Sequence, residues 1–181
     1  MKNQRVLKLT LIALMAAILC ILSPIAIPLP FSIVPISCAT FAVYLCAGVL
    51  GHKLGTISVI IYILLGMVGV PVFAGWSAGV GVVVGPSGGY VIGYLIISFC
   101  TGFFISKTHG NILFTVLGMI IGTIGCYGIG TVWLGMQLDL GVKEALLAGV
   151  VPFILGDIIK IIIATIIIKP LRYQVSKYLR S

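Results

Sequence analysis

Long apolar runs, separated by short gaps rich in glycine, proline or charge, dominate this chain of 181 residues. A helix that crosses the hydrocarbon core of a bilayer needs about 20 predominantly apolar residues. The pattern therefore predicts an all-α integral membrane protein whose residues 1–181 form a single domain of six transmembrane helices. We expect these helices at residues 9–27, 33–51, 54–70, 87–106, 111–135 and 147–169.

The third gap, residues 71–93, is unusual because it is apolar yet interrupted by seven glycines. An ordinary external loop is more polar, and irregular backbone at membrane depth persists only where protein or a cavity surrounds it. We therefore predict a partly re-entrant glycine-rich loop between the third and fourth helices, folded over the outer face of the bundle. A disordered apolar linker is the alternative.

Composition and charge support the membrane assignment. Hydrophobic residues make up 61% of the chain and charged residues 8%, against about 25% charged residues in a soluble domain. The net charge of +8 does not indicate a nucleic-acid partner, because the basic residues lie at the ends and in short gaps facing lipid headgroups. With both termini cytoplasmic, including a basic tail from about residue 170, nine of the eleven basic residues are inside, which agrees with the positive-inside rule.

The sequence gives little support for a signal peptide or for cysteine-based metal or disulfide sites. Lys2, Arg5 and Lys8 precede an apolar run as in a signal peptide, but the run is long enough to span a membrane and no A-x-A cleavage site follows it. The five cysteines form no CxxC or Cys/His cluster, so neither a metal site nor a disulfide framework is indicated.

Asp157 and Lys160 are charged residues inside the last predicted helix, in the segment PFILGDIIK. Each charge costs about 2.5–3.5 kcal/mol at the bilayer centre on insertion scales. Positions i and i+3 share a helix face, so one interpretation is a pair that neutralises itself inside the bundle. We favour the other, a polar ligand site in the outer half of the membrane under the glycine-rich loop, because intramembrane ionisable residues mark functional sites by default.

The glycine-rich loop supplies further candidates. The segment GPSGGY, residues 85–90, places backbone N–H groups near a predicted helix start, where a polar ligand can bind. It lacks the lysine of a P-loop, so this chain carries no such nucleotide site. Trp76 and Tyr90 are either interfacial belt residues or, since glycines flank them, ligand contacts.

A second pattern, GWSAG at residues 75–79, matches the GxSxG nucleophile motif. That motif needs a strand–turn–helix setting and a histidine partner. His52 and His109 are expected at the cytoplasmic end, whereas Ser77 is expected at the outer end. We therefore predict no enzymatic activity, with a membrane serine hydrolase as the remote alternative.

Small residues recur at i, i+4 spacing in the first and fifth predicted helices, as Ala13/Ala17 and Gly118/Gly122. In lipid, such residues let helices approach closely. Gly118 and Gly122 predict helix packing. The Ala13/Ala17 face packs either on another helix of this chain or on a different subunit.

Three segments, PLPFSIVPIS, GPSGGY and PFILGDIIK, resemble the BioY family, the biotin-binding S components of energy-coupling factor (ECF) vitamin transporters. The resemblance covers nearly the whole chain, and the GPxGGY and PFxxGDxxK motifs are specific as a pair. It implies a prokaryotic cell-membrane protein that captures biotin from outside and needs no cofactor. By the same resemblance, the ligand-binding residues are Asp157, Lys160, Pro86, Ser87, Gly88, Gly89 and Tyr90, with Trp76 added by its position in the loop.

The resemblance also implies partners. The Ala13/Ala17 spacing is similar to the motif through which S components dock a transmembrane coupling (T) subunit, and two ATPase subunits drive the cycle. The chain departs from the family at Ser37 and Ala39, where a threonine and a glutamine are frequent, and at Ser87, where threonine is frequent. Two alternatives remain: an S component for another small vitamin, and an ion-coupled carrier in which Asp157 takes up the proton.

Overall fold

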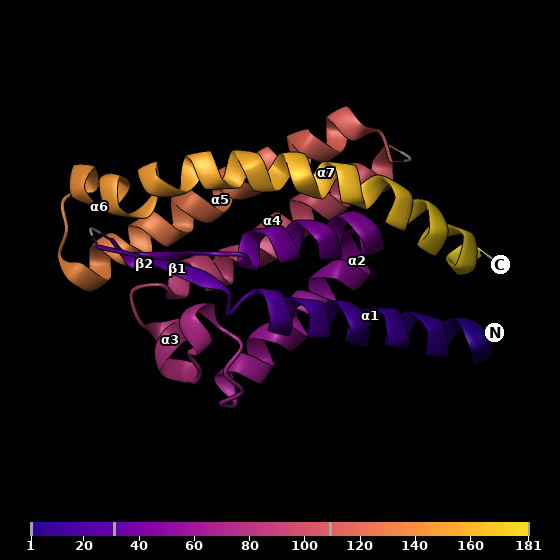
Figure 1. Ribbon diagram of the computed structural model, residues 1–181, viewed down its shortest axis with the longest axis horizontal. Helices are drawn as coiled ribbons and strands as arrows, with labels where there is room; N and C mark the ends of the chain where they lie inside the picture. The colour runs from indigo at the N-terminus through magenta and orange to yellow at the C-terminus, as the bar shows by residue number, and fades with distance from the viewer. Residues whose placement is uncertain (1, 31, 109, 181) are drawn as a thin grey trace.

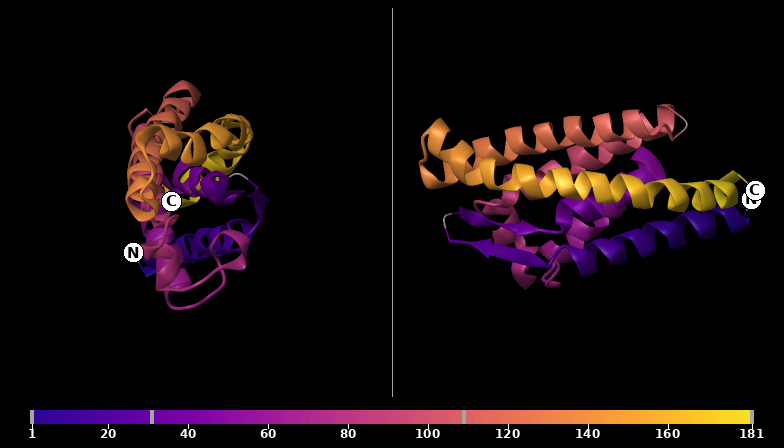
Figure 2. Two further views of the ribbon diagram at one scale, coloured as in Figure 1. Left: turned by 90° about the vertical axis from the view of Figure 1, so that its left-hand side faces the viewer. Right: turned by 45° about the horizontal axis from the view of Figure 1, so that its top comes forward.

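Long helices lie side by side along the longest axis of the molecule, a computed structural model that describes residues 2–30, 32–108 and 110–180. Both chain ends lie at one end of the bundle, and a β-hairpin and two short helices lie at the other (Figures 1 and 2). The elements are α1 (Lys2–Leu22), β1 (Ala26–Leu29), β2 (Ser32–Ser37), α2 (Ala39–Met67), the 3₁₀ turn η1 (Ala74–Trp76), α3 (Val80–Val84), α4 (Gly88–Lys107), α5 (Ile112–Leu138), α6 (Val142–Gly149) and α7 (Val151–Arg180).

The helix α2 reverses its direction at Gly51, which has φ 79° and ψ 179°. Positive φ is a region that glycine adopts readily. In a straight helix Ala47 and Gly55 would be about 12 Å apart, yet a Cβ at Gly55 would lie 2.9 Å from the Ala47 Cα. The two halves of α2 therefore pack antiparallel to each other. They correspond to the two separate helices that the sequence predicts before and after the gap at residues 51–53.

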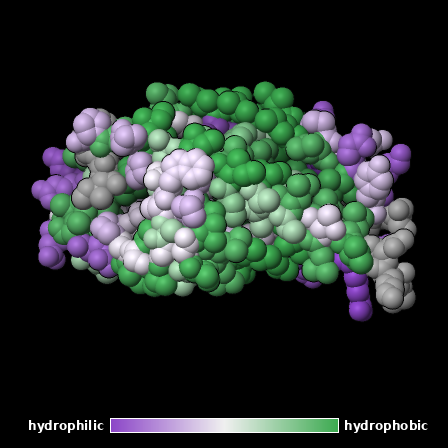
Figure 3. Space-filling view, turned by 60° about the horizontal axis from the view of Figure 1, so that its bottom comes forward, coloured by the Kyte–Doolittle hydropathy of each residue, from purple (hydrophilic) through white to green (hydrophobic). Residues whose placement is uncertain are grey.

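The predicted all-α membrane class is confirmed. Within the described residues, five helices are long and apolar enough to cross a membrane, with α2 taken as one unit. Because α2 reverses at Gly51, these five helices give six helical segments along the bundle. Figure 3 shows the matching surface, with an apolar band around the middle and polar residues gathered at the two ends.

Three predicted boundaries are wrong. The first helix, expected at 9–27, ends at Leu22, and residues 26 and 27 belong to strand β1. Residues 33–37, expected to begin the second helix, belong to strand β2, which pairs antiparallel with β1. Prolines 28 and 35 have no backbone N–H to donate, which suits a short two-stranded hairpin better than a helix. The last predicted helix, 147–169, is in fact two elements: α6 ends at Gly149, and α7 runs from Val151 through the basic tail to Arg180.

The helices α4 and α5 pack at the closest distance that backbones allow, because glycines line their contact. A Cβ at Gly122 would lie 2.8 Å from the Ile97 Cα, and one at Gly118 would lie 2.9 Å from the Phe104 Cβ. The packing role predicted for Gly118 and Gly122 is therefore confirmed. This close pair forms a wall of the bundle, on which α2, α6 and α7 pack.

The glycine-rich segment folds over the end of the bundle that carries the hairpin, where η1 contacts both strands. Phe73 anchors it: the side chain is 1% exposed and meets the Tyr62 ring edge-on at 5.6 Å. Backbone N–H groups of Gly75 and Gly79 donate to the carbonyls of Pro24 and Gly66 at 3.0 and 2.7 Å. The segment is thus an ordered cap, and its re-entry into the membrane stays a prediction.

The turn at Gly51 gives a test of this packing. A Cβ at Gly102 on α4 would come within 2.4 Å of the backbone nitrogen of His52, so we expect Gly102→Ala to lower the free energy of unfolding by about 1–3 kcal/mol. The measurement is thermal unfolding in detergent. Gly128→Ala is the control, because a Cβ there meets nothing within 4 Å; equal destabilisation by both changes would contradict the packing argument.

Candidate functional site

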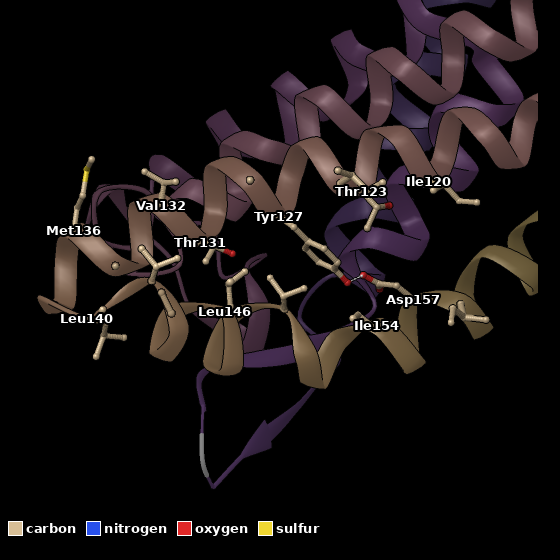
Figure 4. A pocket seen from close by; sticks show the side chains of 18 of the residues that line it. Ile120, Thr123, Tyr127, Thr131, Val132, Met136, Leu140, Leu146, Ile154 and Asp157 are labelled. Atoms are coloured by element: carbon tan, nitrogen blue, oxygen red, sulfur yellow. Dashed lines mark hydrogen bonds between the residues drawn. The ribbon is translucent and has the colours of Figure 1, made fainter.

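Asp157 and Lys160 form an ion pair inside the bundle, with the Lys160 Nζ 2.9 Å from the Asp157 Oδ1 and side chains 15% (Lys160) and 5% (Asp157) exposed. The hydroxyl of Thr40, at the start of α2, donates to the same Oδ1 at 3.0 Å and accepts from the Lys160 Nζ at 3.0 Å. The phenol of Tyr127 on α5 donates to the other carboxylate oxygen, Oδ2, at 2.6 Å (Figure 4). Three helices therefore meet at one carboxylate.

The hydrogen-bonding capacity of the Asp157 carboxylate is filled more completely than that of the Lys160 ammonium. The Asp157 carboxylate accepts three hydrogen bonds. An ammonium carries three N–H donors, and among the described residues Lys160 uses two of them. The two charges therefore largely neutralise each other, as the interpretation of a self-neutralised pair predicted. Lys160 also keeps one N–H donor for a ligand, which the interpretation of a polar ligand site requires.

A cavity in two adjoining parts lies beside this pair. The smaller part, about 40 Å³, includes Asp157 and Lys160 in its wall, and the larger part, about 320 Å³, extends under the glycine-rich cap. Since ligand pockets are about 300–1,000 Å³, the joint cavity suits a small molecule with one polar end. The residues that line both parts are Val34, Pro35, Ser37, Tyr90 and Tyr94.

Tyr90 lines both parts of this cavity, and its hydroxyl is already engaged in a hydrogen bond within the protein. The Tyr90 Oη donates to the Gly149 carbonyl at 2.9 Å, and Gly130 allows the ring to lie against α5, since a Cβ there would overlap it. The Phe153 ring lies 6.4 Å from the Tyr90 ring, centroid to centroid. The cavity thus combines flat aromatic walls with a charged end.

The structure brings most of the predicted ligand-binding residues to this cavity. Asp157 and Lys160 line the small part, and Pro86, Ser87 and Tyr90 line the large part. Three others lie elsewhere: a Cβ at Gly88 would overlap the Val83 carbonyl, one at Gly89 would overlap Trp133, and Trp76 is 66% exposed. Gly88 and Gly89 act in packing, and ligand contact by these three residues stays a prediction.

Sequence reasoning missed Thr40 and Tyr127, the two residues that hold Asp157 from other helices. Their only signal was a polar side chain within an apolar segment, and many membrane helices carry such residues. It also missed two anchors of the cap on α5. The Trp133 Nε1 donates to the Gly85 carbonyl at 2.9 Å, and the Gln137 amide donates to the Val84 carbonyl at 3.1 Å.

The GxSxG alternative lacks its histidine in the part of the chain that the structure describes. The Ser77 hydroxyl donates to the Ala74 carbonyl at 2.8 Å. His52 packs against Phe99 and Phe103 at the Gly51 turn, near the opposite end of the bundle, and His109 lies outside the described residues. Within those residues no group of three or more His, Cys, Asp or Glu side chains gathers to hold a metal ion.

A larger cleft of about 1,100 Å³ lies on the other side of Tyr127 and Asp157, between α5 and the pair α6–α7 (Figure 4). Its walls are mostly exposed aliphatic side chains such as Ile124, Val132 and Ile158. Aliphatic surface of this kind is what faces lipid in a membrane protein. The Tyr127–Asp157 hydrogen bond therefore separates a lipid-facing cleft from the polar cavity.

A charged pair buried in a six-segment membrane bundle, beside an aromatic-walled cavity under an ordered cap, defines a membrane-embedded binding protein for a small polar molecule. The model of the BioY family matches residues 1–177, and the chain belongs to that family. Proteins of this family are transporter components rather than enzymes.

Individual relatives agree over most of the chain. The protein is 37% identical over 166 residues to the biotin transporter BioY2 of Lactococcus lactis subsp. cremoris, covering 92% of this chain and 90% of the relative. It is 37% identical over 142 residues to the biotin transporter BioY of Thermotoga maritima, covering 78% and 82%. The crystal structure of the S-component for biotin from an ECF-type ABC transporter superposes with a TM-score of 0.88, at 35% identity over 96% of this chain and 94% of that one.

The Tyr127 hydrogen bond can be tested without any ligand. Tyr127→Phe removes a donor from a carboxylate that is 4% exposed, and hydrogen bonds to charged groups contribute about 1.5–3 kcal/mol. We expect a lower melting temperature in detergent. Tyr178→Phe, at a side chain that is 62% exposed, is the control, and an unchanged melting temperature for Tyr127→Phe would refute the assigned contact.

Proposed function

We propose that this protein is the high-affinity biotin-binding S component of an ATP-driven ECF-type importer. The observation that carries the proposal is the Asp157–Lys160 pair, held by Thr40 and Tyr127 at the polar end of a small-molecule cavity. Membership of the BioY family supports biotin as the ligand. The fold alone would not, because one fold hosts many ligands.

The chemistry of biotin fits the two ends of the cavity. Biotin has a ureido head, a thioether ring and an aliphatic chain that ends in a carboxylate. The Asp157 carboxylate can accept a ureido N–H, and the remaining N–H of Lys160 can donate to the ureido oxygen. The thioether ring and chain then lie against Tyr90 and Tyr94 in the 320 Å³ part, with Ser87 near the cap.

The arrangement of the chain ends supports a topology for the importer. Lys53 follows the turn at Gly51, and Lys107 is the last residue of α4. The Gly51 turn lies beside the end of α4 and beside Arg172 on α7, since a Cβ at Gly51 would be 2.7 Å from the Ser106 Oγ and 3.9 Å from the Arg172 Nη1. The C-terminal half of α7 leads to the end of the bundle where both termini lie (Figure 1). Under the positive-inside rule that side is cytoplasmic, and the cap and hairpin face outside. Biotin then enters from the outer face under the cap and leaves toward the cytoplasm.

A biotin titration of the purified protein tests the site directly. We expect saturable binding at one site per chain, and Asp157→Asn and Lys160→Met should each weaken it by about tenfold or more, because each leaves a buried polar partner unpaired. Calorimetry in detergent measures the affinity. Asp139→Asn and Lys177→Met are matched controls outside the proposed site, and near-normal affinity in both site variants would exclude this pair from the site.

The same titration shows whether Lys160 contacts the ureido head or the carboxylate of biotin. If Lys160 meets the ureido oxygen, Lys160→Met weakens biotin and biotin amide, which lacks the carboxylate charge, by the same factor. If Lys160 pairs with the ligand carboxylate, the loss is confined to biotin. No binding of either compound by the wild-type protein would favour another small vitamin as the ligand.

The coupling partner can be tested at the first helix. Ala13 and Ala17 are exposed on α1, so they do not pack inside this chain, and small residues permit close approach of a second helix. We propose that this face docks the T subunit, which associates with two ATPase subunits; the absence of a P-loop in this chain fits that division of labour.

We expect Ala13→Leu combined with Ala17→Leu to abolish copurification with the T subunit, since the added side chains hold the helices apart, while biotin affinity is unchanged. Gly128→Leu, on the exposed face of α5, is the control and should leave copurification intact. Wild-type recovery of the T subunit with the double variant would place the interface elsewhere.

A further inference from the structure

The cleft between α5 and the pair α6–α7 has a volume of about 1,100 Å³. Tyr127 from α5 and Asp157 from α7 meet across it (Figure 4). Its mouth includes Asp139 and Leu140, at the end of the bundle that carries the hairpin. Asp139 is 12 residues after Tyr127, which is about 18 Å along a helix. The cleft therefore runs from that end of the bundle to the back of the proposed biotin site.

The polar side chains deep in the cleft are already hydrogen-bonded to the rest of the protein. The Thr123 hydroxyl donates to the carbonyl four residues before it at 2.7 Å. The Thr131 hydroxyl is hydrogen-bonded to the Tyr90 hydroxyl at 3.3 Å. The Tyr127 phenol donates to Asp157, whose carboxylate accepts three hydrogen bonds. Among the described residues, this part of the cleft thus has no unused side-chain donor for a polar ligand, and apolar spaces of this kind do not hold water.

The walls of the cleft consist mainly of bulky aliphatic side chains. Its α7 wall is formed by Val150, Ile154, Ile158 and Ile161. Interfaces between membrane helices are enriched in small residues that let backbones approach, and none of these four wall residues is small. A hydrocarbon chain, in contrast, gains dispersion contacts on any closely approached aliphatic surface. The walls therefore favour the acyl chain of a lipid over the helix of a partner protein.

The length of the cleft matches one leaflet of a bilayer. The hydrocarbon core is about 30 Å thick, so one leaflet supplies about 15 Å of it. An acyl chain that begins at the level of Asp139 therefore extends about as far as Tyr127. It covers the membrane-facing side of the Tyr127–Asp157 hydrogen bond, where a buried carboxylate needs to be kept from unpaired contact with lipid and water.

The charge at the mouth of the cleft indicates the kind of headgroup. Asp139 lines the mouth and is exposed. Glu144 is a second acid nearby in sequence, and its carboxylate accepts from the Gly141 N–H at 3.1 Å. Lys143 compensates one of these two negative charges. An ammonium group therefore complements this end of the cleft, whereas a headgroup with a net negative charge is repelled by Asp139.

We propose that this cleft binds a phospholipid with an amine headgroup, from the leaflet at the end that carries the hairpin. The ammonium group pairs with Asp139, and one acyl chain lies between α5 and α7 as far as Tyr127. The lipid thereby seals the back of the polar cavity on the side that faces the membrane. This site goes beyond the proposed function and does not depend on which small molecule the polar cavity binds.

The test is thermal unfolding of the purified, delipidated protein in a non-ionic detergent, titrated with phosphatidylethanolamine or with phosphatidylglycerol. We expect a saturable rise in melting temperature, with a half-maximal concentration about threefold lower for phosphatidylethanolamine, because the ion pair at the exposed mouth is weak. Asp139→Asn should remove this difference between the two lipids. Glycerophosphoethanolamine, the same headgroup without acyl chains, should leave the melting temperature unchanged.

Ile158→Trp tests the cleft itself. We expect it to raise the half-maximal lipid concentration by about tenfold or more, because the indole occupies the path of the chain and removes its dispersion contacts. Ile159→Trp is the matched control, since Ile159 is 51% exposed against 50% for Ile158 and is not among the residues that line the cleft. It should respond to lipid as the wild type does, and both variants should melt like the wild type without lipid.

Equal losses in the two tryptophan variants, or no loss in Ile158→Trp, would overturn the proposal. Stabilisation by glycerophosphoethanolamine alone would also overturn it, because the site would then bind a headgroup without a chain. Equal half-maximal concentrations of the two lipids for the wild type would overturn the contact assigned to Asp139. Absence of stabilisation by either lipid would overturn the whole proposal and would favour a helix of a partner protein as the occupant.

Discussion

The buried carboxylate of Asp157 is the constraint on which the rest of the structure depends. A charge in a membrane bundle is tolerated only when partners surround it, and here the partners come from three helices: Thr40 from α2, Tyr127 from α5 and Lys160 from α7 itself. Each contact fixes one helix relative to α7. The same contacts leave one donor of Lys160 for the cavity, so the group that organises the bundle also forms the polar end of the proposed biotin site.

Two sets of close contacts form the walls of the cavity. One set packs α4 on α5, and the other anchors the hairpin and the cap. Glycines let α4 and α5 pack as a tight pair, which presents Tyr90, Tyr94 and Tyr127 on one side. The hairpin and the cap cover the other side, with Phe73 buried against Tyr62 and the cap fastened to α5 by Trp133 and Gln137. A binding protein of this kind needs a rigid wall and a cover. Hydrogen bonds from Trp133 and Gln137 to the backbone of the cap hold the cover in place, and they leave the space between the cap and the wall open.

Acidic and basic residues are distributed unequally between the two ends of the molecule. The end with the cap carries the acids Asp139 and Glu144, whereas the end with the termini carries basic residues only. Lys169 and Arg172 line a cavity there. The exposed small-residue face of α1 leaves a third surface, separate from both cavities, for the proposed coupling subunit.

The sequence by itself determined the membrane class, the six helical segments, the turn at Gly51 and the Asp157–Lys160 pair, because hydrophobic run length and buried charge are local properties. Only the tertiary structure decided the rest. The hairpin at 26–37 replaced the predicted end of the first helix and the predicted start of the second, since proline pattern and strand pairing outweigh apolar length there. Thr40 and Tyr127 are 117 and 30 residues from Asp157 in sequence, and no local pattern links them to it. The roles of Gly88 and Gly89 in packing, and the exposure of Trp76, likewise depend on which surface each residue meets after the chain has folded.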